Sequence, residues 1–257
     1  MVKYMLSRKV FIFYPNKDSF ITYDYAYQVM SNIYKYISEI DKSKEDFLHN
    51  KGYQLKSGHV YKLFNHTLRF KGAKFNKNNI FIPKTGIVFL TISGTRKNID
   101  IITQGIENVK KLVISNSMFT YKKTVSSKKV IFANKMEYKT LSPVVTRTKN
   151  DKGISEFVSI QNTEKYFKNI AVNAMRKYKL VFNKEFDNNK TPIYFDIDIN
   201  NIKEKSIKIK NNGYVRGYLY TIRAECSDKN MQKILYYAGI GEKNSLGFGT
   251  LEYVKGE

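Results

Sequence analysis

The alternation of apolar and polar residues along the chain predicts one series of strands and helices that occurs twice. In the first half the pattern predicts strands over 4–13, 60–64, 68–75, 79–83, 87–94 and 111–121, and helices over 23–37, 42–50 and 97–110. The last of these helices is the clearest, because Ile99, Ile102 and Ile106 recur at the spacing that places side chains on one helix face. Asp41 and Ser43 are suited to cap the second helix.

The second half repeats the order of the first. It predicts strands over 136–147, 192–199, 203–210, 215–225 and 248–254, and helices over 162–177 and 228–238, with Asn162 as a cap. Each half is therefore β-α-β-β-α-β, the ferredoxin-like order. We predict an α+β protein with two tandem ferredoxin-like (RRM-like, βαββαβ) domains, over 1–123 and 124–257. Many RNA-handling proteins use such a sheet, although the fold alone does not define a function.

The charge of the chain narrows the class of partner. Forty-five Lys and Arg face 22 Asp and Glu, so the formal net charge is +23. A polyanion such as nucleic acid is the usual partner of so basic a protein, because lysines that bind phosphates release condensed counterions. A genome biased toward Lys, Asn, Ile and Tyr is the alternative explanation. The apolar fraction of 42% is large enough for a core, which excludes global disorder.

Cysteine and the N-terminus bear on the compartment. Cys226 is the single cysteine, which excludes an intramolecular disulfide and a thiolate cluster for zinc. The N-terminal stretch MVKYMLSRKVFIFYP has neither an apolar run that could span a bilayer nor a small-residue cleavage site. We therefore expect a cytoplasmic protein with no membrane partner.

The acidic residues give little support for a metal site. Asp196 and Asp198 alternate in the predicted strand YFDIDI and could together hold Mg²⁺. A third ligand is missing nearby in sequence, and the surroundings are rich in lysine. We therefore predict surface ion pairs with neighbouring lysines, and expect neither a metal nor a cofactor.

A glycine-rich string near the C-terminus, GIGEKNSLGFG, is the most informative motif. Its glycines are Gly239, Gly241, Gly247 and Gly249, and its tip is Lys243, Asn244 and Ser245. The string lacks the third glycine of a dinucleotide fingerprint and the GK[ST] ending of a phosphate loop. Glycines permit close approach of a phosphate chain to backbone N–H groups. Taken generically, a helix-to-strand turn that needs positive φ angles explains the string equally well.

In sequence and position this string resembles the GhGxxxxxGhG loop of the repeat-associated mysterious protein superfamily, where h is apolar. Within it, the chain is similar to the CRISPR-associated endoribonucleases that cut the repeat transcript. The resemblance implies binding of CRISPR repeat RNA, as precursor and mature guide. It also implies metal-independent attack by a 2′-hydroxyl, which leaves 2′,3′-cyclic phosphate and 5′-hydroxyl ends.

The alternative function is that of a non-catalytic RNA-binding subunit of a CRISPR interference complex. A basic DNA-binding protein ranks last, since no helix-turn-helix or zinc motif is present.

The resemblance also assigns candidate catalytic residues. Cleavage without a metal needs groups that move protons and a cation that stabilises the charged phosphorane, roles suited to histidine and lysine. By motif, His49 in FLH is the general acid or base, Lys62 in YKLF is the charge stabiliser, and Tyr34 in NIY is the family's tyrosine. Three alternatives stay open: Tyr36 for Tyr34, Lys51 or Lys56 for Lys62, and His66 as a further catalytic group. His59 follows Ser57-Gly58 and is typical of a turn.

We expect the RNA to lie on the glycine-rich string and on two basic stretches. One stretch covers 122–149, and the other has Lys203, Lys205, Lys208 and Lys210 on a strand or hairpin. Arg216 and Arg223 are candidates for bidentate contacts, and Tyr218 and Tyr220 for stacking on unpaired bases. The resemblance further suggests other subunits of an interference complex, or a second copy of the chain, as protein partners.

Overall fold

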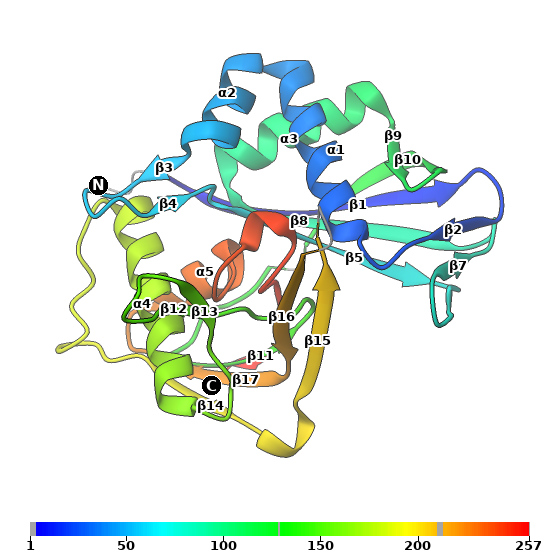
Figure 1. Ribbon diagram of the computed structural model, residues 1–257. Coiled ribbons are helices and arrows are strands. Elements are labelled where there is room, and N and C mark those ends of the chain that lie inside the picture. Colours follow the sequence, from blue (N-terminus) through cyan, green and yellow to red (C-terminus); the bar gives the residue numbers. More distant parts are fainter. Residues whose placement is uncertain (1–3, 128, 210–212, 257) are drawn as a thin grey trace.

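The computed structural model describes residues 4–127, 129–209 and 213–256. Its architecture rests on two antiparallel sheets, one from each half of the chain (Figure 1). The first sheet has the strand order β5 (Phe64–Lys71), β8 (Ile87–Thr95), β1 (Leu6–Pro15), β10 (Ser117–Ser126) and β9 (Lys111–Ile114). The second has the order β14 (Tyr194–Ile197), β17 (Thr221–Glu225), β11 (Lys135–Thr140) and β18 (Leu251–Gly256).

Helices connect the strands in the same way in both halves. In the first half α1 (Tyr25–Ile40) and α3 (Arg96–Val109) cover one face of the sheet, and α2 (Lys42–Asp46) leads into the π-helical turn η1 (Phe47–Lys51) (Figure 1). In the second half α4 (Thr163–Phe182) follows β11 and α5 (Lys229–Ala238) follows β17. Both sheets therefore have the second, third, first and fourth strands of a βαββαβ unit side by side, and the predicted tandem ferredoxin-like fold is confirmed.

The placement of the boundary at 123/124 stays a prediction. Strand β10 continues to Ser126, and the next sheet strand, β11, begins at Lys135. Two of the predicted caps are present: Asp41 accepts a hydrogen bond from Lys44 N at 2.8 Å, and Asn162 accepts one from Lys165 N at 3.2 Å. Within the described ranges no helix is long and apolar enough to cross a membrane.

Short elements complete the two halves. One small sheet contains β2 (Ser19–Ile21), β7 (Ile80–Ile82) and β6 (Lys74–Phe75). Three further strand pairs are β3 (Tyr53–Gln54) with β4 (Val60–Tyr61), β12 (Arg147–Lys149) with β13 (Ser155–Phe157), and β15 (Lys203–Lys208) with β16 (Tyr214–Leu219). The 3-10 turns are η2 (Ile199–Asn201) and η3 (Asn244–Leu246).

Several predicted strands were wrong in extent. In place of the strands predicted over 60–64 and 68–75 there are the short β4, the longer β5 over Phe64–Lys71 and the short β6. The segment 111–121 is a hairpin, because the backbone turns at Ser115, where φ is 53°. The strand predicted over 136–147 ends at Thr140. The strand predicted over 215–225 divides at Tyr220, since the Thr140 hydroxyl accepts from Tyr220 N and donates to Tyr220 O at 2.8 and 2.9 Å. Those bonds add to the backbone bond from Thr140 N to Tyr220 O at 3.0 Å. Before Tyr220, β16 lies outside the sheet and pairs with β15.

The two halves are joined by α5 and by a buried arginine. Helix α5 packs against β1, β5 and β8, on the face of the first sheet opposite α1 and α3. The Arg8 side chain on β1 donates to Leu251 O at 2.6 Å, and its guanidinium lies 4.0 Å from the centroid of the Tyr236 ring. The Asn65 amide donates to Tyr237 O at 2.9 Å. These contacts fix the glycine-rich string against the first half.

Candidate active site

The three residues assigned to catalysis lie together in the structure. Tyr34 is on α1, His49 is on η1, and Lys62 directly follows β4. The rings of Tyr34 and His49 are edge to face, with centroids 5.2 Å apart. The Lys62 ammonium donates to the backbone oxygen of His49 at 2.9 Å. Residues from three segments, up to 28 positions apart in sequence, therefore form one cluster.

The His49 imidazole is the exposed member of this cluster. Its Nδ1 lies 3.0 Å from the side-chain oxygen of Asn50, and the neighbouring Leu48 is buried and anchors the turn. An imidazole held at its backbone and open to solvent can accept or donate a proton on a bound polymer. The predicted general acid or base is therefore accessible to solvent, and its role in proton transfer stays a prediction.

Tyr34 is the buried side chain that packs against the His49 ring. Its side chain is 9% exposed, and its hydroxyl donates to Leu48 O at 3.4 Å, at the outer limit of hydrogen bonding. Burial, with a smaller effect of the Glu45 carboxylate, raises the pKa of Tyr34 to about 12. The phenol therefore keeps its proton at neutral pH and can donate a hydrogen bond, but it is a poor base.

Lys62 is placed by its neighbours in the chain and on α3. Gly52 ends η1 with φ of 71°, and a Cβ there would lie 2.8 Å from Val60 and 3.2 Å from the Lys62 side chain. The turn and the segment after β4 therefore approach closely only with glycine at position 52. The Asn98 amide on α3 donates to Lys62 O at 3.1 Å. Partial burial lowers the pKa of Lys62.

The open alternatives are separated by geometry. Tyr36 is fully buried and its hydroxyl donates to Lys111 O at 2.7 Å, so it does not contact the histidine. Lys51 and Lys56 are exposed to solvent, whereas the Lys62 ammonium is hydrogen-bonded to His49 O. The geometry therefore favours Tyr34 and Lys62, and their catalytic roles stay predictions.

The other two histidines have different surroundings. His66 is 1% exposed on β5, and burial lowers its pKa to about 4, so it is neutral and enclosed. Its position excludes it as an accessible catalytic group in this conformation. His59 is in the turn predicted for it, with Nδ1 3.1 Å from the Ser57 hydroxyl.

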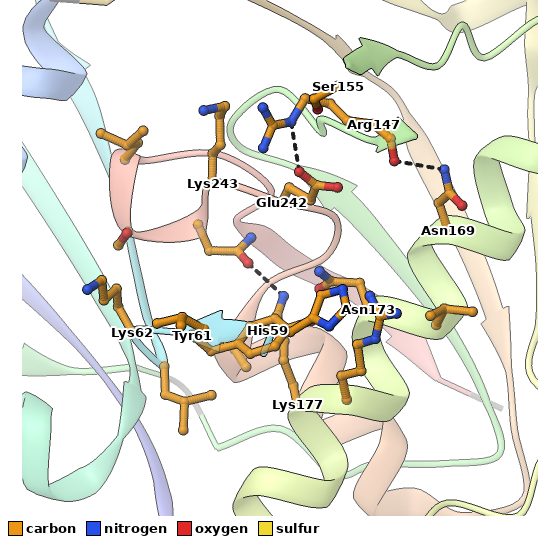
Figure 2. Close-up of a pocket in the computed structure, with 18 of the residues that line it drawn as sticks. His59, Tyr61, Lys62, Arg147, Ser155, Asn169, Asn173, Lys177, Glu242 and Lys243 are labelled. Carbon is orange, nitrogen blue, oxygen red and sulfur yellow. Dashed lines mark hydrogen bonds and ion pairs between the residues drawn. The ribbon is translucent and has the colours of Figure 1, made fainter. Parts of the chain in front are cut away.

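A cleft of about 630 Å³ begins beside Lys62 and separates the two halves (Figure 2). One wall is the segment His59–Phe64, and the other walls are β12, β13, α4 and the tip of the glycine-rich string. Its cationic side chains are Lys62, Arg147, Lys149, Arg176, Lys177 and Lys243. The acidic group in this lining, Glu242, pairs with Arg147 at 2.9 Å. A cleft of this charge suits a phosphate chain.

The four glycines of the string are buried and pack against protein. All have positive φ, and a methyl group on Gly249 would lie 1.9 Å from Ile240 O. A methyl on Gly247 would lie 2.9 Å from the His66 ring. The structure thus gives a packing reason for Gly239, Gly241, Gly247 and Gly249. Contact of Lys243, Asn244 and Ser245 with RNA stays a prediction, and all three line the cleft.

The basic hairpin is present, with its lysines on two faces. Lys203 and Lys205 on β15 point to one face, and Lys208 points to the other, because side chains alternate along a strand. Arg216 on β16 lies 3.2 Å from Glu204, and Arg223 on β17 lies 3.1 Å from Glu137. Lys210 lies outside the described residues. RNA contacts of these side chains stay predictions.

The prediction that Tyr218 and Tyr220 stack on unpaired bases was wrong. Tyr218 is 6% exposed and Tyr220 is 3% exposed. The Tyr220 hydroxyl lies 3.1 Å from the Tyr166 hydroxyl, and both rings belong to the core of the second half. Tyr166 on α4 contacts both rings, so they are not available to stack on RNA bases.

The two aspartates have separate roles. Asp196 lies 3.9 Å from Arg223, an arginine rather than the predicted lysine, and Asp198 accepts a hydrogen bond from Asn200 N at 3.0 Å at the start of η2. Across the three described ranges, no three His, Cys, Asp or Glu side chains gather where they could hold a metal ion.

Sequence reasoning missed the part of the cleft that α4 supplies. Asn169, Asn173, Arg176 and Lys177 line it from one side of the helix. Their spacing of four, seven and eight residues is the signal that could have identified a polar helix face.

Three comparisons place the chain among known proteins. Residues 125–253 match the family model described as CRISPR associated protein Cas6, C-terminal. The CRISPR-associated endoribonuclease Cas6 1 of Methanocaldococcus jannaschii is 26% identical over 239 residues, which cover 91% of this chain and 88% of that protein. The solved structure of a Cas6-related gene product from Pyrococcus furiosus has a TM-score of 0.81 at 22% identity, over 98% of this chain and 100% of that one. A structure described as a RAMP protein binding different RNA substrates has the same TM-score at 22% identity, over 97% and 100%.

Proposed function

The chain belongs to the Cas6 family of CRISPR-associated proteins, and on this premise we propose that it is an endoribonuclease that binds CRISPR repeat RNA and cuts the precursor into guide RNAs. The Methanocaldococcus jannaschii relative, which matches most of the chain, is named a CRISPR-associated endoribonuclease. The observation that carries the proposal is the meeting of His49, Tyr34 and Lys62 beside a basic cleft.

The proposed chemistry is transesterification without a metal. The 2′-oxygen forms a bond to the adjacent phosphorus, and the bond to the 5′-oxygen breaks. The products are a 2′,3′-cyclic phosphate and a 5′-hydroxyl. His49 either takes the proton of the 2′-hydroxyl or gives one to the departing 5′-oxygen, since its ring is the accessible imidazole beside Tyr34. Lys62 stabilises the negative phosphorane, and the protonated Tyr34 orients the imidazole.

The basic cleft is the proposed path of the RNA backbone. Arg147, Arg176 and Lys243 line it from three different elements, and Lys62 connects it to the catalytic cluster. Side chains of this kind contact phosphates and set the register of the RNA. The hairpin of β15 and β16 provides further lysines nearby, on the front of the molecule in Figure 1. We also propose a cytoplasmic location, and interference-complex subunits or a second copy as protein partners.

Cleavage in the presence of EDTA tests the proposed function. Purified protein is incubated with the repeat RNA of the neighbouring CRISPR array, with and without the chelator, and the product ends are mapped. Equal rates and 2′,3′-cyclic phosphate ends are expected, because the three side chains supply both the proton transfer and the positive charge. Binding without cleavage would favour the non-catalytic RNA-binding subunit, and loss of cleavage with EDTA would contradict metal independence.

The choice among the lysines gives a second prediction. Lys62→Met is expected to lower the single-turnover cleavage rate by about tenfold, below the ~10²-fold of a fully buried charge donor because Lys62 is partly solvated. Lys51→Met and Lys56→Met, which remove the same charge from exposed positions, are expected to change it less than about twofold. A larger loss in either of these controls would transfer the role of charge stabiliser to that lysine.

A further inference from the structure

Lys177 on α4 is a charged side chain in the interior. It is 2% exposed, although it is among the largest buried side chains of the protein. Its ammonium donates three hydrogen bonds, to Gly239 O at 2.8 Å, to Gly241 O at 3.2 Å and to the Asn244 side-chain oxygen at 2.6 Å. Figure 2 shows Lys177 at the cleft, with one of these bonds as a dashed line. An ammonium has three N–H groups, so each one has an acceptor. All three acceptors belong to the glycine-rich string.

Asn244 extends this connection across the string. Its amide nitrogen donates to Ile240 O and to Phe248 O, each at 3.0 Å. The amide oxygen receives Lys177, so one asparagine ties the entering backbone, the leaving backbone and α4 together. A Cβ on Gly239 or on Gly249 would lie 2.9 Å from the Asn244 nitrogen. The glycines therefore leave the space that this asparagine fills.

This network sets the position of the string's tip. Lys243 and Ser245 flank Asn244 in sequence, and both line the cleft. Lys243 itself has a left-handed backbone, with φ of 57°, which an L-residue adopts only when its surroundings hold it there. The ammonium of Lys177 is the buried group that bonds both to the start of the string and to its tip.

We propose that Lys177 is a positioning residue for RNA binding, whose ammonium holds the tip of the glycine-rich string in the conformation that receives the RNA, and that loss of its proton releases the tip. The inference rests on the proposed function, because it takes the cleft to be the path of the RNA. A neutral amine keeps two N–H groups, which leaves one of the three acceptors without a donor.

We call the three hydrogen bonds from the Lys177 ammonium to the glycine-rich string the clamp. Its surroundings give the clamp a pH dependence. Burial lowers the pKa of Lys177 to about 7, and the Glu242 carboxylate opposes that effect. The other titratable or charged groups that line the cleft are His59, Tyr61, Lys62, Arg147, Lys149, Arg176 and Lys243. Since protonation makes the clamp, it is complete below neutral pH and is lost as the pH rises through about 7. RNA affinity is expected to fall in that same interval.

Equilibrium binding of the repeat RNA at constant ionic strength tests the inference, in a His49→Ala background that prevents cleavage. The parent is expected to bind about tenfold more weakly at about pH 8 than at about pH 6, the effect of one charged hydrogen bond. Lys177→Met should bind about tenfold more weakly at the lower pH and show no such change. Lys177→Arg, which stays charged, should remove the pH dependence but retain more of the affinity.

Two control variants isolate the effect. Lys168→Met removes one charge from an exposed position of the same helix, and is expected to keep the pH profile. His59→Gln removes the imidazole from the cleft and tests whether that side chain, rather than Lys177, causes the profile. A flat profile of the parent, or the parental profile and affinity in folded Lys177→Met, overturns the inference. A profile that disappears with His59→Gln and persists in Lys177→Met overturns it as well.

Hydrogen exchange measured without RNA distinguishes failure of the Lys177 inference from failure of the proposed function. The amides of Ile240, Glu242 and Gly249 are bonded to Gly249 O, Val145 O and Pro143 O. These amides should exchange faster, relative to the intrinsic rate, in Lys177→Met and in the parent above about pH 7. If Lys177→Met does not fold, the exchange of the parent across this interval decides, and unchanged protection overturns the clamp. Absence of RNA binding by the parent, with the exchange as expected, would count against the proposed function alone.

Discussion

Replacing His49 by alanine is expected to slow cleavage of repeat RNA by roughly 10²–10⁴-fold, the range for loss of a general acid or base. In the proposed mechanism the exposed imidazole transfers the proton, and neither neighbour can take its place. Tyr34 keeps its proton because burial raises its pKa to about 12, and the Lys62 ammonium is occupied by His49 O. The measurement is the single-turnover rate with protein in excess over RNA, so that binding does not limit it.

The matched control is His59→Ala, which removes a second exposed histidine from the same half of the chain. It should leave the rate within about twofold, in the range of ordinary surface substitutions. RNA affinity should also be little changed in His49→Ala, since the imidazole acts on protons rather than on phosphate charge. A His49→Ala protein that cleaves at the parental rate would remove the imidazole from the mechanism, and with it the proposed role of the cluster.

The order of elements could be predicted because periodicity is a local property of the sequence. In α3 the isoleucines at 99, 102 and 106 are all buried, as the helical spacing requires. The caps at Asp41 and Asn162 were also predictable, since a short polar side chain before an apolar run satisfies free N–H groups at a helix start.

The errors in the strands have long-range or exceptional causes. The turn falls at Ser115-Asn116-Ser117, a polar run typical of turns, but it contains no glycine, and the apolar residues on both sides continue the pattern of one strand. The end of β16 depends on bonds between Thr140 and Tyr220, which are 80 residues apart. Tyr218 and Tyr220 are buried because both rings contact Tyr166 on α4, a long-range contact that a pattern of alternating residues cannot show.

The candidate site divides in a similar way. His49 and Lys62 could be located because the short motifs FLH and YKLF resemble motifs of the family. The side chains at the opposite wall of the cleft, such as Arg176 and Lys177, become neighbours only when α4 packs beside the glycine-rich string. The glycine pattern identified the loop, but its burial shows that the glycines create space for Asn244 and His66 within the protein.

A single 2′-deoxy substitution at the cut site is expected to abolish cleavage, leaving any residual rate more than about 10⁴-fold below that of the unmodified RNA. The loss should exceed that of His49→Ala, which removes an acid–base contribution of ~10²–10⁴-fold while the nucleophile stays in place. In the proposed reaction the 2′-oxygen is the atom that attacks the phosphorus, and no side chain of the cluster can replace it. The measurement compares single-turnover rates of the two RNAs.

The same substitution should hardly affect binding, because phosphate contacts in the cleft do not depend on one sugar hydroxyl. The control RNA has its 2′-deoxy sugar one nucleotide to the 3′ side of the cut, so that it loses the same group but keeps the nucleophile, and it should be cleaved at close to the normal rate. Two results therefore separate the possible mechanisms. Cleavage of the first RNA at the normal position would mean that water attacks the phosphorus, as in a hydrolytic reaction, and the proton taken by His49 would then belong to that water. Loss of cleavage together with loss of affinity would mean that the hydroxyl is needed for recognition, and it would leave its role as the nucleophile without support.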